Sequence, residues 1–308
     1  RHTGPTRKRS RAGIFRVPGR YKGVGGYESL VSFSPLVHKT KPPHTLVLGT
    51  VPSINSFDRG QYYATCNNAF WHIVGDALGH RRKEPDGGWR NKNGSSIRIP
   101  DFIQSNLLYP NGPYMDYASQ VEEMLNAGFA IWDVLGTCDR IGATDSKIKA
   151  TTARPNNIRE FCTKYPSIRK ICFASGASTA TYFRKFNKEW LANTDAFTFA
   201  SNNLTQSVFS KYIKNQRIYQ SSSLESATPM KRRQKSLKVE GKEDSKESTQ
   251  SPIHLVVMYS VSPAYTRPWK NTPEAPEASK YMYTDKRAFW FVEAFGLDVP
   301  NTRRHFEG

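Results

Sequence analysis

Hydroxyl, amide and aromatic side chains gather in two neighbouring stretches of this chain. The first, VLGTVPSINS at residues 47–56, is an apolar run that meets a turn with a glycine, a proline, serines and an asparagine. Turns of this kind at the end of a parallel strand are where α/β proteins bind ligands. The second, RGQYYATCNNAFWHIV at residues 59–74, sets paired tyrosines beside paired amides. Flat rings next to hydrogen-bonding amides suit a nucleic-acid base held outside its stack.

Phe70 and Trp71 open the helical part of the second stretch, and their placement has two interpretations. Both rings fit the core face of an amphipathic helix that Asn67 or Asn68 caps, because a side-chain oxygen can accept from the first backbone N–H groups. Both rings also fit a stacking surface for a base. We favour the core for these two rings, yet keep Phe70 with Tyr63 among the candidate base contacts.

Three further apolar runs end in comparable turns, with the sequences DVLGTCDR, ASGAS and SVSPAYT. Most of these turns combine Gly or Pro with hydroxyl residues, which present backbone N–H groups and side-chain donors to a phosphate or a base edge. Each turn alone is more often an ordinary loop. Together they add candidate contacts with a base or a phosphate: Thr50, Val51, Ser53, Arg140, Ser175 and Ser262.

These turns need a scaffold that brings them together, and the sequence predicts one. Four apolar, partly β-branched runs, at residues 45–50, 129–135, 168–175 and 254–260, alternate with helix-like segments. Such alternation indicates a parallel sheet covered by helices on both faces. The predicted fold class is α/β, a three-layer sandwich with a mainly parallel central sheet of four or five strands. FTFAS at residues 197–201 is the candidate fifth strand.

A single folded domain is predicted for residues 28–308. Residues 1–27 are basic, glycine-rich and poor in apolar periodicity, which predicts a disordered arm. Residues 80–115 are typical of a loop-rich insertion, since Pro, Gly and Asn mark turns there. Residues 221–251 carry Ser, Lys and Glu in place of core residues, which predicts a flexible inserted loop. The first residue is not Met, so the sequence leaves open that the chain is a fragment.

The charge of the chain points to a polyanionic partner. Lys and Arg number 45 against 26 Asp and Glu, a formal net charge of +19. Basic side chains that neutralise phosphates release condensed counterions, so nucleic acid is the leading partner. RKRSR in the arm fits non-specific DNA binding or nuclear import, and equally a solvated tail. On the import interpretation we expect a nuclear protein, with cytoplasm or an organelle left open.

Metal, cofactor and membrane sites are not expected. The four cysteines lie far apart without a C-x-x-C pair, and the histidines have no partner at metal-ligand spacing. No Walker-type phosphate loop occurs. No apolar run reaches the roughly 18 residues of a membrane span, and no signal-peptide pattern opens the chain. We expect a soluble monomer with reduced thiols.

Taken together, these stretches resemble the uracil-DNA glycosylase superfamily, and most of all its hypoxanthine-DNA (deoxyinosine) glycosylase branch. The resemblance rests on LGTVPSINSFDRGQYYATCNNAFW, GFAIWDVLGTCDRIGATDSKI, NNIREF with PSIRKICFASG, and VVMYSVSPAY, which follow in the family's order. It implies a uracil-DNA glycosylase-like fold and an enzyme of base-excision repair. Such an enzyme flips a deaminated base, hypoxanthine ahead of uracil, out of DNA and hydrolyses its N-glycosidic bond.

The resemblance also implies roles for single residues. Where the wider superfamily places a water-orienting acid or amide, this chain has Val51. The hypoxanthine branch instead uses the Asn of an Asn-x-Phe-Trp motif, which matches Asn68, and Tyr63 matches the aromatic that stacks on the flipped base. Ala174 stands in place of an asparagine that helps to read the base in related enzymes, with Ser175 as the neighbouring substitute.

SVSPAYT resembles the second conserved motif of the superfamily, which presses on DNA. Ser262 and Pro263 would compress the phosphate backbone together with Ser53, and Ala264 or Tyr265 would fill the gap left by the flipped base. A rigid turn at the end of a strand is the alternative.

Two acids and one arginine in the second matched stretch need separate interpretations. Asp133 lies close to a strand end and is a rival catalytic group, or else a buried structural carboxylate. Asp145 is expected to cap a helix together with Ser146. Arg140 is a candidate phosphate contact.

The leading functional hypothesis is a monofunctional, metal-independent DNA glycosylase. A non-catalytic DNA-binding module with the same fold is the first alternative, which Val51 and Ala174 would permit. A hydrolase of free nucleosides is the second, and it would not need a basic surface. If Tyr63 and Asn68 face one pocket the enzyme is favoured, whereas divergent side chains would favour the binding module.

Overall fold

The computed structural model describes residues 18–23, 25–90, 94–262 except 226–250, and 275–299. Its centre is a sheet of five parallel strands in the order β10-β11-β9-β3-β6. These strands are β3 (Thr45–Gly49), β6 (Phe129–Asp133), β9 (Lys170–Phe173), β10 (Phe197–Phe199) and β11 (Ile253–Val257). All four predicted runs and the candidate fifth strand are therefore strands of one sheet, and the predicted fold class is confirmed.

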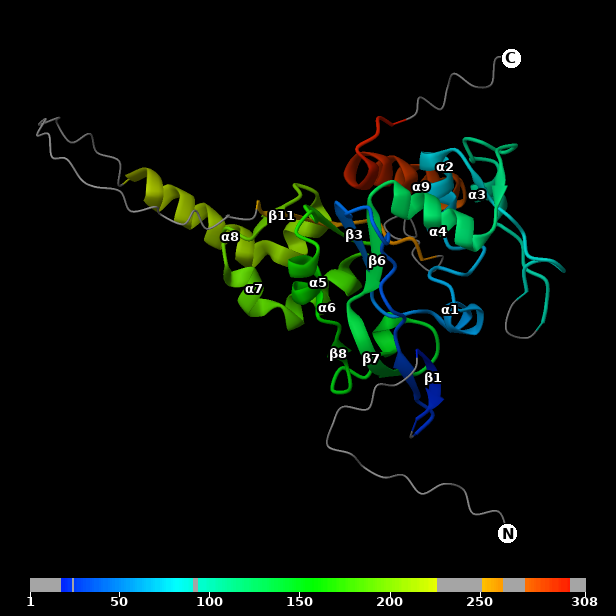
Figure 1. Cartoon of the computed structure of the whole chain (residues 1–308), viewed down its shortest axis with the longest axis horizontal. Helices are drawn as coiled ribbons and strands as arrows, with labels where there is room; N and C mark the ends of the chain where they lie inside the picture. Colours follow the sequence, from blue (N-terminus) through cyan, green and yellow to red (C-terminus); the bar gives the residue numbers. More distant parts are fainter. Residues whose placement is uncertain (1–17, 24, 91–93, 226–250, 263–274, 300–308) are drawn as a thin grey trace, which may run out of the picture.

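Helices cover both faces of this sheet (Figure 1). In β3, Leu46 and Leu48 point into one core and Val47 into the other, because successive side chains of a strand alternate between faces. The leucine core receives side chains from α5 (Ile158–Lys164), α6 (Ala177–Phe186), α7 (Lys188–Ala192) and α8 (Asn203–Glu225). The valine core receives them from α2 (Phe70–Leu78), α3 (Asp101–Gln104), α4 (Tyr117–Asn126), α9 (Ala275–Trp290) and the π-helix Phe291–Phe295.

A second, antiparallel sheet lies beside the central one in the order β1-β2-β7-β8. Its strands are β1 (Gly19–Lys22), β2 (Glu28–Val31), β7 (Leu135–Arg140) and β8 (Arg154–Pro155). The arm was expected to reach residue 27, and this is wrong at its end, since residues 19–22 form β1. The sequence does not predict this strand, because it pairs with β2 through its backbone and its largely exposed side chains give no apolar pattern.

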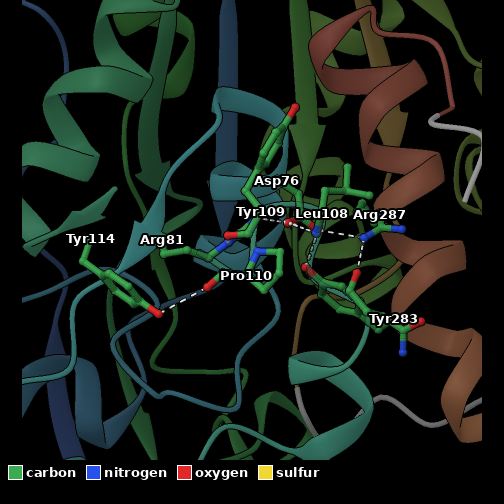
Figure 2. A network of polar contacts seen from close by, with 9 residues as sticks. Asp76, Arg81, Leu108, Tyr109, Pro110, Tyr114, Tyr283 and Arg287 are labelled. Atoms are coloured by element: carbon green, nitrogen blue, oxygen red, sulfur yellow. Dashed lines mark hydrogen bonds and ion pairs between the residues drawn. The ribbon is translucent and has the colours of Figure 1, made fainter. Parts of the chain in front are cut away.

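The insertion at residues 80–115 has short elements of its own, β4 (Arg81–Arg82), α3 and β5 (Tyr114–Met115). It is tied to α2 and α9 by a buried network around Asp76 (Figure 2). One Asp76 oxygen accepts from Arg81 and from the backbone N–H of Leu108, and the other accepts from Tyr283 and Arg287. The carboxylate thus binds groups from three segments that are far apart in the sequence.

Two predicted features fall partly or wholly outside the described residues. Helix α8 continues to Glu225, into the stretch predicted to be a flexible loop, and residues 226–250 are not described. Residues 1–17 of the predicted arm are likewise not described. Among the helices that are described, none combines the length and the apolar character that crossing a membrane requires.

Candidate functional site

A cavity of about 640 Å³ lies at the carboxyl ends of β3, β6 and β9. This is the edge of a parallel sheet at which ligands are expected. Nine of the candidate residues from the sequence line it together: Thr50, Val51, Ser53, Tyr63, Asn68, Asp133, Arg140, Ser175 and Ser262. Segments more than 200 residues apart in the chain therefore meet around one space.

The hydroxyl groups of Thr50 and Ser53, in the turn after β3, already have hydrogen-bond partners within the protein. The hydroxyl of Thr50 donates to Asp145 Oδ2 over 2.6 Å and lies 2.7 Å from the hydroxyl of Thr179. Ser53 caps the short helix α1 (Ile54–Arg59), because its Oγ accepts from the N–H of Ser56 over 3.2 Å. Val51 presents an apolar wall to the cavity. Side-chain contact with a base or phosphate is therefore less favoured for Thr50 and Ser53 than the sequence suggested.

Tyr63 is unusual in both its backbone and its side chain. It has φ +53°, and it is the one residue other than glycine with positive φ in the part of the chain that the structure describes. Its hydroxyl is buried and has no hydrogen-bond partner among the described residues. Its ring packs on Phe70 with 4.1 Å between ring centroids. Phe70 is fully buried and does not line the cavity, so it supports Tyr63 from the core and is not itself a base contact.

Asn68 lies just before α2 and lines the cavity. The N-cap of α2 is Ala69, and no side chain caps the helix, so the predicted cap at Asn67 or Asn68 is wrong. Asn68 Oδ1 instead accepts from the N–H of Phe70, the first residue of α2, over 2.9 Å. The next residue, Ala69, donates its N–H to the carbonyl of Val261 over 3.0 Å, which joins this segment to the loop after β11. Tyr63 and Asn68 thus face the same cavity, the arrangement that favours the enzyme hypothesis.

Asp133 is the buried acid at the end of β6. It lies opposite Gly49 in the register of β3 and β6, and a Cβ on Gly49 would overlap its Oδ1. Its Oδ2 accepts a 2.7 Å hydrogen bond from Ser32. The side chain is only 3% exposed, and this burial, with a smaller effect from Asp145, raises its pKa to about 7. The bond from Ser32 and the charge of Arg140 act in the opposite direction.

Asp145 is a cavity residue that sequence reasoning placed elsewhere. It begins a 3-10 turn, Asp145–Lys147, in which no side chain caps the N-terminus, so the predicted cap is wrong. Its carboxylate instead accepts from Thr50 and, over 3.2 Å, from Ser178. Burial raises its pKa, while these two bonds and Arg140 act in the other direction. No local pattern signals this position, because the partners lie 95 and 33 residues away.

Arg140 holds two loops of the cavity wall. The side chain is 1% exposed, and it donates to the carbonyls of Pro52 and Gly142 over 3.1 and 3.0 Å. Burial lowers the pKa of its guanidinium group. These contacts favour a role in positioning the turn after β3, and the predicted phosphate contact is not supported by this geometry.

The loop after β11 completes the described part of the wall. Ser260 Oγ accepts from the N–H of Ser262 over 3.3 Å, and Val261 donates its N–H to Ala174 over 3.1 Å. Ser175 and Ser262 both line the cavity. The candidate wedge residues lie outside the described residues: Pro263, Ala264 and Tyr265. Within the described ranges, no group of three or more His, Cys, Asp or Glu side chains is placed to hold a metal ion.

A curated relative confirms the resemblance to the hypoxanthine-DNA glycosylases. The chain is 26% identical over 128 residues to a hypoxanthine DNA glycosylase of Methanosarcina acetivorans, a match that covers 42% of this chain and 61% of that protein. A solution NMR structure of a proposed uracil DNA glycosylase from the same organism aligns with a TM-score of 0.35 and 22% identity, over 53% of this chain and 79% of that one. No protein-family model matches the chain.

Proposed function

We propose that this protein is a DNA glycosylase that removes a deaminated base, hypoxanthine ahead of uracil, by hydrolysing its N-glycosidic bond. The observation that carries the proposal is the shared cavity of Tyr63, Asn68 and two carboxyl groups, Asp133 and Asp145. Similarity to the Methanosarcina acetivorans hypoxanthine DNA glycosylase supports the reaction class. The formal net charge of +19 supports DNA as the partner.

The reaction places two demands on the cavity. Water forms a bond to C1′ of the sugar as the C1′–N bond breaks, so positive charge develops on the sugar and negative charge on the base. The proton of the water passes to a carboxylate, and the base leaves with the bonding electrons and takes a proton from solvent. Catalysis therefore needs a group that orients and deprotonates water, and donors that stabilise the leaving base.

Asn68, Asp133 and Asp145 are the candidates for the water-side role. The amide oxygen of Asn68 has a second lone pair beyond the one that accepts from Phe70, so it can hold a water while it keeps this hydrogen bond. The two carboxyl groups have raised pKa values, which brings them toward the range in which a general base works near neutral pH. This division of roles retains Asn68 and Asp133 from the sequence and adds Asp145.

Tyr63 is the candidate for the base side. Its hydroxyl group is a buried donor without a described partner, a state that costs free energy until a ligand supplies an acceptor. Its ring is fixed between Phe70 and the cavity, so it offers a rigid surface on which an extruded base can stack. Backbone N–H groups of the turn after β3 remain further candidate donors.

The decisive experiment uses end-labelled oligonucleotides that contain a single hypoxanthine, uracil or xanthine. The protein is incubated with each in EDTA, and alkali then reveals abasic sites. A break at hypoxanthine that needs alkali is expected, with uracil weaker, and free deoxyinosine should not be cleaved. If no substrate breaks while salt-sensitive DNA binding persists, the proposal fails in favour of a binding module. Cleavage of the free nucleoside would favour the nucleoside hydrolase.

A further inference from the structure

Two arginine side chains share one tryptophan ring beside the cavity. The guanidinium carbon of Arg82 lies 4.3 Å from the ring centroid of Trp89, and that of Arg59 lies 5.1 Å from it. Arg59 ends α1, whereas Arg82 and Trp89 belong to the insertion. Cation–π attraction stabilises each pair. The insertion is thereby fastened to the helix whose first residues line the cavity.

Hydrogen bonds place this cluster against the cavity wall. Arg82 donates to the carbonyl of Ala64 over 2.8 Å and to that of Thr65 over 3.3 Å, and Thr65 lines the cavity. The Cys66 thiol donates to the carbonyl of Arg98 over 3.5 Å. The insertion therefore runs directly alongside the segment from Tyr63 to Asn68. We call the side chains of Arg59, Arg82, Lys83, Arg90 and Arg98 the basic ledge.

The basic ledge carries an excess of positive charge. Its five basic residues lie beside two acids of the insertion, Glu84 and Asp86, while Arg81 is paired with the buried Asp76 and is not part of the ledge. Of the acids, Glu84 accepts from the backbone N–H of Trp89 over 3.3 Å, and Asp86 is exposed. Near α1, Asp58 is paired with Arg20. Lys83, Arg90 and Arg98 are exposed, and Arg59 is partly so.

Like charges are held close together in this arrangement. Burial, and to a smaller extent the charge of Arg59, lowers the pKa of Arg82 to about 10. Arg59 is also fixed in place, because it donates to the carbonyl of Arg90 over 3.2 Å. An anion bound next to these fixed guanidinium groups would offset their mutual repulsion and make charge-assisted hydrogen bonds with them.

We propose that the basic ledge binds the phosphates of the DNA strand that flanks the extruded nucleotide. The ledge borders the cavity, and hydrogen bonds hold the guanidinium groups of Arg59 and Arg90 in place before binding. Phosphates at regular spacing are the anions that DNA presents there. The inference rests on the proposed function for the place of the nucleotide. It adds a binding surface outside the cavity, supplied by the insertion.

The test measures how DNA affinity depends on salt. The full chain and its variants are titrated with a labelled duplex that contains a tetrahydrofuran abasic analogue, over a series of salt concentrations. For Arg59→Gln with Arg98→Gln, the slope of log K against log salt should become shallower by about 0.9 for each lost phosphate contact. Arg59→Lys with Arg98→Lys should retain the wild-type slope.

A matched control removes two charges elsewhere. Lys211 and Lys214 are exposed residues of α8, which lies far from α1 in Figure 1. The double variant Lys211→Gln with Lys214→Gln should leave the slope unchanged. An unchanged slope in the Arg59 and Arg98 variant, or an equal loss in the α8 variant, would overturn the proposal.

Base release by the same preparations separates the two proposals. If wild type cleaves hypoxanthine DNA but the slope of the ledge variant is unchanged, the glycosylase proposal stands and the proposal for the ledge is rejected. If the slope changes but wild type does not cleave, the ledge stands as a DNA-binding surface and the glycosylase proposal is rejected. If wild type does not bind the duplex, both proposals are rejected.

Discussion

At the scale of single residues, several side chains of the cavity are in states that cost free energy in the folded protein. Tyr63 adopts φ +53°, a conformation that costs a non-glycine residue of the order of 1–3 kcal/mol. Its hydroxyl is buried without a described partner, and Asp133 is buried as an acid of raised pKa. Costs of this kind persist where the surrounding structure over-determines them, and they cluster at functional sites.

The adjacent tyrosines should respond oppositely to loss of their hydroxyl groups. Tyr63→Phe removes an unpartnered buried hydroxyl and should leave the free energy of unfolding unchanged or raise it. Tyr62→Phe removes a hydroxyl that donates to the carbonyls of Phe33 and Ser34, and should lower that free energy by about 1 kcal/mol. If Tyr63 contacts the base, its variant should also slow cleavage about tenfold to a hundredfold. Urea denaturation and single-turnover kinetics measure the two effects, and a destabilised Tyr63→Phe would contradict the first.

The structural and the catalytic role of Asn68 should be separable. Asn68→Ala is expected to slow cleavage by about two to three orders of magnitude, the usual loss for one preorganised polar group. It should also lower the free energy of unfolding by about 1 kcal/mol through the lost hydrogen bond from Phe70. Asn68→Ser keeps a side-chain oxygen that can accept from this N–H, so stability should recover while cleavage stays slow. Asn126→Ala, at the end of α4 away from the cavity, is the control. Wild-type rates in Asn68→Ala would shift the catalytic role to Asp133 or Asp145.

The raised pKa of Asp133 makes stability depend on pH. The folded pKa is about 7 against an ordinary 3.8, so the protonated acid is favoured in the fold. The stabilisation is fully present below the unfolded pKa and is lost as pH rises through the folded one, by at most about 1.4 kcal/mol per pH unit. Asp133→Asn lacks this titration. Its stability relative to wild type should therefore rise between pH 3.8 and about 7 and then level off. Urea denaturation across that range tests this, and a constant difference would contradict it.

At the scale of elements, two contacts determine how the cavity is built. The absence of a side chain on Gly49 lets the carboxylate of Asp133 lie against β3, because a Cβ there would overlap Asp133 Oδ1. On the other side, α2 begins at Phe70, two residues after Asn68, and carries Asp76 near its end. The same helix therefore links the cavity to the network that holds the insertion and α9 (Figure 2).

Loss of Asp76 should be severe, because two buried arginines would lose their partner. Asp76→Ala leaves Arg81 and Arg287 at 3% and 2% side-chain exposure without this carboxylate. Removal of one side of such a buried pair costs about 3–5 kcal/mol. Thermal and urea denaturation should show this loss. Asp86→Ala, an exposed acid of the same insertion, should change stability by less than about 0.5 kcal/mol. A similar, small effect of both changes would contradict the structural role given to Asp76.

At the scale of the whole molecule, charge and topology combine to favour a DNA substrate. The net charge of +19 acts at long range on any polyanion. The sheet gathers one cavity at its carboxyl edge, and the basic ledge borders that cavity. Single-chain function, metal independence and nuclear location stay predictions from the sequence.

The basic arm should contribute to affinity and not to the chemical step. Removal of residues 1–17 takes away six basic residues while it keeps β1 and the pairing of Arg20 with Glu28 and Asp58. DNA affinity should fall, and the salt slope should become shallower by up to about 0.9 per lost phosphate contact. The cleavage rate at saturating protein and the melting temperature should stay at wild-type values. A slower rate at saturation would assign the arm a role in the reaction.

The sequence by itself determined the layers and the place of the cavity. The runs around Leu46, Ile131, Ile171 and Leu255 alternate with helical segments, and apolar periodicity is a local property that neighbouring residues carry. A parallel sheet then places its strand ends at one edge, which is why Thr50, Asp133 and Ser175 could be expected to lie close together. Tyr63 and Asn68 were selected through the family resemblance, and they line the same cavity.

Only the tertiary structure decided what each side chain does at that edge. Asp145 faces the cavity and Arg140 binds backbone carbonyls, neither of which follows from its sequence neighbours. Strand β1 likewise forms through backbone pairing with β2. Hydrogen bonds and burial depend on groups that the chain brings together from positions tens of residues away, so local patterns do not encode them.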